Sequence, residues 1–149
     1  MDRGLMRRPP RDPRAPLFEA RMLGESLLLG ATMLASVAAA YGWAVAAGVP
    51  PAEARALGFA AIVLGNLALI FVNRSAERPV TESLRQPNVA LWWITAGALA
   101  ALAAAIYVPP VAAVFRFAPL AVHEVGVALL AGVAGVAWYE VRKLRSAWM

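Results

Sequence analysis

Few polar side chains that could bind a ligand or take part in a reaction lie inside the long apolar runs of this chain. Asn66, in the stretch LGNLALIFVNRS, lies about midway along the charge-free run Ala56 to Asn73. Its carboxamide oxygen can ligate a cation, or the amide can hydrogen-bond to another helix. Polar groups at such positions are the usual markers of function in membrane segments. Both interpretations of Asn66 stay open on the residues alone.

Titratable side chains in and beside these runs lie toward their ends. Glu25 and Glu140 sit where water can reach them, and His123 and Glu124 lie near the start of the last run. One histidine and no cysteine give no metal-ligand cluster and no nucleophile–base pair, and no glycine loop for phosphate is visible. We therefore expect no catalytic residue and no cofactor in this chain.

Long apolar runs decide the fold class. The chain has 149 residues, of which 61% are hydrophobic and only 15% charged. Four runs of 18 to 24 residues would span ~27–36 Å as helices, against a hydrocarbon core of roughly 30 Å. The sequence predicts an all-α integral membrane bundle of four transmembrane helices, forming one domain over 22–149. We place the helices at about 24–48, 55–74, 89–108 and 120–141.

A basic, proline-rich segment precedes the first run. The stretch GLMRRPPRDPRAPLF holds four arginines and four prolines, and the prolines favour an extended path. We predict a cytosolic arm over 1–21. It lacks interleaved aromatic residues and is tethered at a bilayer, so nucleic acid is not an expected partner. Anionic lipid or an acidic protein surface fits its charge better.

The basic residues also predict the orientation. Of the fourteen Lys and Arg residues, twelve lie in the N-terminal arm, the second connector and the C-terminal tail. Only Arg55 and Arg116 lie in the other two connectors. The positive-inside rule then places both termini in the cytoplasm. The outer connector VPPVAAVFRFAPL is mostly apolar, and we expect it to lie in the membrane interface.

Small residues recur at four-residue spacing along the predicted helices, which favours close helix packing in lipid. The pairs are Ala31–Ala35, Ser36–Ala40, Gly97–Ala101, Ala128–Gly132 and Ala131–Gly135. For the hydroxyls of Thr32, Ser36 and Thr95 we expect hydrogen bonds to carbonyls four residues earlier.

Several stretches together resemble a known family. MRRPPRDPRAPLF, LGNLALIFVNRS, NVALWW, YVPPVAAVFRFAPL and WYEVRKL fall in the order and spacing found in bacterial P-type cation-transporting ATPases of the calcium-pump-like class. The resemblance covers residues 4–145. It implies that the chain corresponds to transmembrane helices seven to ten, the C-terminal membrane region of such a pump, in the bacterial inner (plasma) membrane.

The resemblance implies roles for several residues. In the family, the arm helps to couple the phosphorylation domain to the membrane helices, which assigns domain coupling to the residues Arg7, Arg8, Pro9, Pro10, Arg11 and Arg14. The expected partners are the catalytic portion of the pump, with helices one to six and the cytosolic domains, and membrane lipid. Asn66 falls in the helix that contributes an acidic ion ligand in calcium pumps, which makes Asn66 a candidate metal ligand. In this chain that helix has no acidic residue at membrane depth.

The family's phosphorylated aspartate motif, nucleotide domain and helices four to six have no counterpart here, so the chain is not expected to hydrolyse ATP alone. We expect a gene fragment, a split-gene product or an isolated C-terminal domain that packs against the ion-pathway helices. The alternative is an autonomous four-helix membrane protein, such as a small exporter or an accessory subunit. A proton-coupled exporter would need a carboxylate embedded in the membrane in its first helix. Glu25 lies at the edge of that helix, which argues against an exporter of this kind.

Overall fold

The described part of the chain is helical. The computed structural model describes residues 20–73 and 89–147, and every regular element in these ranges is an α-helix. The helices are α1 (Ala20–Ala46), α2 (Pro51–Asn73), α4 (Val89–Tyr107), α5 (Pro109–Phe115) and α6 (Val122–Ala147). All but α5 are long and apolar enough to cross a membrane. The predicted all-α class with four membrane spans is confirmed.

The elements begin where local chemistry allows a helix to start. α2 begins at Pro51, a residue whose fixed φ suits the first helical position, directly after the turn in which Gly48 has a φ of 75°. α1 begins at Ala20, inside the range that we predicted as arm, and residues 1–19 of that range lie outside the described residues. The short α5 lies in the outer connector, where we expected no helix. Pro109 and Pro110 open it.

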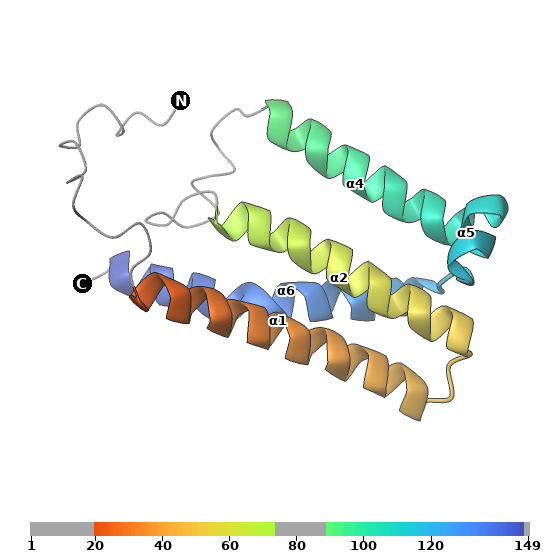
Figure 1. Ribbon diagram of the computed structural model, residues 1–149, viewed down its shortest axis with the longest axis horizontal. Coiled ribbons are helices and arrows are strands. Elements are labelled where there is room, and N and C mark those ends of the chain that lie inside the picture. The colour runs from red at the N-terminus through yellow and green to blue at the C-terminus, as the bar shows by residue number, and fades with distance from the viewer. Residues whose placement is uncertain (1–19, 74–88, 148–149) are drawn as a thin grey trace.

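The four long helices run up and down, with α5 at one end (Figure 1). The start of α1 and the end of α6 lie together at the left of the view, whereas α5 and the α1–α2 turn lie at the right. Helices α1, α2 and α6 contact one another extensively. By comparison, α4 has few contacts with α2, and its buried residues lie near its two ends: Leu91, Ala105 and Ile106.

Helices α2 and α6 approach closely where two glycines face each other. A Cβ atom added to Gly132 would lie 2.7 Å from the backbone nitrogen of Gly65 and 3.1 Å from the carbonyl oxygen of Ala61. The Met33 side chain of α1 lies over Gly65, and a Cβ on Gly135 would lie 2.9 Å from the Met33 Cα. Three helices therefore meet at backbone distance around two glycines of α6.

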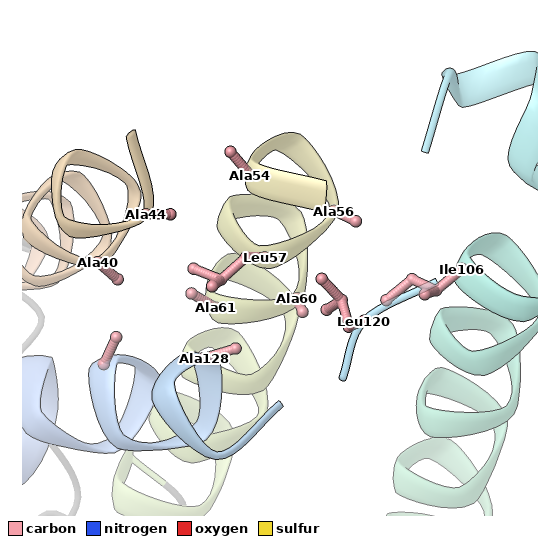
Figure 2. Packing of buried hydrophobic residues seen from close by; sticks show 11 residues of the cluster. Ala40, Ala44, Ala54, Ala56, Leu57, Ala60, Ala61, Ile106, Leu120 and Ala128 are labelled. Atoms are coloured by element: carbon pink, nitrogen blue, oxygen red, sulfur yellow. The ribbon is translucent and has the colours of Figure 1, made fainter. Parts of the chain in front are cut away.

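Small side chains also fill the larger core cluster (Figure 2). On one side of α2, Leu57 and Ala61 lie near Ala40 and Ala44 of α1 and Ala128 of α6. On the other side, α2 meets Ile106 of α4 and Leu120 of the connector that leads to α6. The cluster is mostly alanine, and the described core therefore depends on close backbone approach more than on large side chains.

The paired small residues divide into two sets. Ala128–Gly132 and Ala131–Gly135 of α6 are buried, and Ser36–Ala40 of α1 is buried or half-buried. In contrast, Ala31–Ala35 of α1 and Gly97–Ala101 of α4 are exposed. Spacing alone did not separate the pairs that pack within the chain from those that face outward.

The glycine contact gives a sharp stability prediction. Gly132→Ala should lower the free energy of unfolding by about 1–3 kcal/mol, because a methyl group has no space against the α2 backbone. Denaturant-induced unfolding in bicelles, followed by circular dichroism, measures this change.

Gly126→Ala on the same helix is the matched control, since nothing lies within 4 Å of its added Cβ. The control should be neutral or slightly stabilising, as alanine favours helix over glycine. Equal loss of stability in the two variants would contradict the packing argument.

Candidate functional site

Side-chain hydrogen bonds join α1 to α6 inside the bundle. The Ser36 hydroxyl donates to the carbonyl oxygen of Ala131 at 2.6 Å. The Thr32 hydroxyl lies 2.8 Å from the carbonyl oxygen of Gly135, and the indole Nε1 of Trp138 donates to Thr32 Oγ1 at 2.9 Å. Two turns of α1 are thus fastened to the small-residue face of α6, where polar bonds in lipid contribute to helix association.

The predicted local bonding of the hydroxyls holds only in part. Thr95 donates to the carbonyl of Leu91, four residues earlier, at 2.9 Å, as expected. Thr32 also lies 3.0 Å from the carbonyl of Leu29, three residues earlier, and shares its single proton between this oxygen and that of Gly135. For Ser36 the prediction was wrong, because small residues bring the α6 backbone within reach of its hydroxyl.

Asn66 lies on the outward face of α2. It is exposed, as are Ile62 and Ile70, which lie one turn before and one turn after it on the same face. Its carboxamide forms no hydrogen bond with another residue of the described ranges. At ~1.5 Å per residue it lies about 10 Å from the end of α2 at Asn73, within the apolar span. This polar group therefore faces out of the bundle at membrane depth.

The titratable groups of the described ranges do not cluster as metal ligands. Over 20–73 and 89–147, no three His, Cys, Asp or Glu side chains come together in a way that could hold a metal ion. Glu124 is buried, and its Oε2 accepts a hydrogen bond of 2.7 Å from the backbone nitrogen of Ala121 at the start of α6. This bond is half of a capping box, whereas the neighbouring His123 is exposed. The Glu124 carboxylate therefore caps the N-terminus of α6.

A second cluster pins the outer connector to the start of α2. Arg55 Nη2 donates to the carbonyl oxygen of Arg116 at 2.7 Å, and Arg116 ends α5 in the left-handed region at a φ of 54°. The ring of Phe59 packs on Phe117 with a centroid distance of 5.3 Å, and Tyr107 Oη donates to the carbonyl of Leu120 at 3.0 Å. These contacts hold α5 against the bundle.

The predicted coupling residues of the arm, between Arg7 and Arg14, lie outside the described residues.

The family comparison agrees with this architecture of four apolar spans. Residues 1–145 match the family model described as Cation transporting ATPase, C-terminus. The chain belongs to this family. It is the C-terminal membrane region of a cation-transporting P-type ATPase, and the resemblance drawn from the sequence motifs is confirmed. A comparison with curated proteins gives no match.

Family membership makes sense of where the polar groups lie. The C-terminal membrane region of these ATPases is part of a larger protein and lacks its catalytic domains. The internal hydroxyls of Thr32 and Ser36 hold the bundle together, and Asn66 faces away from it. Sequence reasoning selected Asn66 by its depth in the span, but it missed the Thr32–Trp138 pair, since no local pattern connects residues so far apart in the chain.

The Thr32–Trp138 pair can be tested by a double-mutant cycle. Thr32→Val should lower the free energy of unfolding by about 1 kcal/mol, the range measured for hydrogen bonds between membrane helices. Trp138→Phe should cost less once Thr32 is already valine, because the shared bond is gone.

Thr95→Val is the control for a lost hydroxyl, since Thr95 bonds only within its own helix. A loss equal to that of Thr32→Val, or an additive cycle, would mean that the contact between α1 and α6 adds no stability.

Proposed function

We propose that this chain is the support bundle of an ATP-driven cation pump, corresponding to helices seven to ten. It packs against the ion-pathway helices of the catalytic portion, numbers five and six in the family, and performs no phosphoryl chemistry by itself. The observation that carries the proposal is the family match over residues 1–145 together with the four apolar spans.

The outward face of α2 supports a docking role. Ile62, Asn66 and Ile70 line this face, and α2 lies between α1 and α4 (Figure 1). An amide without a partner in hydrocarbon costs several kcal/mol, so a helix with a hydrogen-bonding side chain is a fitting neighbour for Asn66. We therefore assign this face to the catalytic portion of the pump, with Asn66 bonding to a polar side chain or to the transported ion.

The arm and the orientation complete the proposal. With both termini in the cytoplasm of a bacterial cell, the arm residues Arg7, Arg8, Arg11 and Arg14 lie on the side of the phosphorylation domain. Their guanidinium groups are fixed charges that suit docking to an acidic protein surface.

Reporter fusions at each terminus test the placement of both termini in the cytoplasm. A terminus found on the outer side of the membrane would overturn it.

The docking role of α2 is tested by replacing Asn66 with leucine, which has similar size but no hydrogen-bonding group. Asn66→Leu should leave the stability of the isolated chain unchanged, because the side chain has no bond in the described bundle. It should reduce recovery of the catalytic portion when a tagged chain is purified from co-expressing membranes.

Asn73→Leu is the matched control, since Asn73 is also exposed but lies at the helix end, where water can satisfy it. If Asn66→Leu leaves assembly intact and lowers only the apparent affinity for the ion, Asn66 is a ligand rather than an assembly contact. Unchanged assembly and unchanged ion affinity would contradict both roles.

Purified alone, the chain should hydrolyse no ATP above a mock preparation. Adding the catalytic portion in the same vesicles should produce cation-dependent ATP hydrolysis. ATP turnover by the chain alone would contradict the support role. Purification of the chain with no partner from cells that express both parts would instead favour the autonomous bundle.

A further inference from the structure

The outer connector carries a surface that neither the bundle nor the proposed docking face explains. Four apolar side chains of this region point outward: Val108, Val114, Phe115 and Val122. Val114 is 78% exposed and Val122 is 90% exposed, although both lie in a segment that is otherwise firmly held. An apolar surface that is fixed in place calls for an apolar environment.

The fold fixes the position of this surface. The backbone nitrogens of Val111 and Ala112 both donate to the carbonyl oxygen of Val108, at 3.0 and 2.9 Å, and start α5. The ring of Phe115 packs on Phe117 at a centroid distance of 5.5 Å, and Phe117 packs on Phe59 of α2. Figure 1 shows α5 at the end of the bundle, turned across the direction of the long helices. Val114 therefore cannot fold inward without breaking these contacts.

Charge lies directly beside the apolar surface. Arg116 follows α5 and is exposed, and Arg55, which donates to the Arg116 carbonyl, is exposed as well. Neither described acidic residue at this end is fully exposed to offset their positive charge, because Glu124 is buried in its capping bond and Glu53 is half-buried. Exposed guanidinium groups beside apolar side chains at the end of a membrane span are typical of a segment that lies in the lipid interface.

We propose that α5 and its flanks form an interfacial anchor that binds anionic phospholipid. Val114, Phe115 and Val122 enter the boundary between headgroups and acyl chains, and Arg116 and Arg55 bind the lipid phosphates. A guanidinium group suits this role because its paired N–H groups match the phosphate oxygens. The inference depends on the four spans and not on assembly with a catalytic portion.

The depth of the anchor is measurable because the chain contains no native cysteine. A spin label on Val114→Cys, with the full chain in vesicles of phosphatidylcholine and phosphatidylglycerol, reports collisions with oxygen and with a water-soluble nickel chelate. The label should collide more with oxygen than with the chelate. Ala47→Cys, exposed in the α1–α2 turn at the same end, is the control and should be accessible to the chelate.

The lipid charge is tested with Arg116→Gln, which keeps the backbone carbonyl that Arg55 binds. In nanodiscs, adding phosphatidylglycerol to phosphatidylcholine should raise the melting temperature of the unmodified chain. Arg116→Gln should remove about half of this rise, since two arginines share the surface. Leu34→Gln, an exposed position in the span of α1, should leave the rise unchanged.

Two results would overturn the anchor. The first is a label at residue 114 that is as open to the chelate as the label at residue 47. If such a label becomes shielded only when the catalytic portion is present, the surface binds protein and not lipid. The second is a phosphatidylglycerol-induced rise in melting temperature that is the same for the unmodified chain and for Arg116→Gln.

Discussion

The backbone contact between Gly65 of α2 and Gly132 of α6 is the constraint on which the rest of this bundle depends. Lipid tails are as apolar as the helices, so burial of hydrophobic surface does not drive the helices together, and close van der Waals contact must do so. The two glycines let α2 and α6 approach at backbone distance, and Met33 of α1 lies over Gly65 of α2 and close to Gly135 of α6. The close approach of Gly135 to the Met33 backbone brings the α6 carbonyls of Ala131 and Gly135 within reach of the α1 hydroxyls.

The packing also determines which surfaces remain for other molecules. Helices α1, α2 and α6 pack on one another through small residues such as Ala44, Ala61 and Ala131, while α4 is buried mainly near its ends. The exposed residues of α2 then form a face with one amide at membrane depth, and the outer connector presents valines beside arginines. In lipid these two surfaces differ in what they require. The amide needs a hydrogen-bonding partner, whereas the valines need only acyl chains.

The four spans could be predicted from the sequence because uninterrupted apolar runs have few alternatives in a membrane protein. Which face of each run is buried could not, since almost every residue is apolar and no polar stripe marks the outside. Thus Ala31–Ala35 and Ala131–Gly135 have the same spacing, yet only the second pair is buried. The helix α5 was missed because Pro109 and Pro110 indicate a stop for α4, and the same residues suit the first turn of a new helix. The depth of Asn66 within its span could be predicted from the sequence, but its outward direction depends on packing.

The order of contacts along the chain bears on how the bundle assembles during synthesis. Both α1 and α2 pack on α6, which follows them in the chain. Thr32 and the Gly135 carbonyl that it approaches are 103 residues apart. Until α6 leaves the ribosome, α1 and α2 can pack on each other, but the backbone of α2 at Gly65 lacks the approach of Gly132. An α1–α2 pair without α6 would therefore lack the contacts that both helices make with α6. A chain interrupted before α6 would reach the membrane without the hydrogen bonds of Thr32 and Ser36 to the α6 backbone.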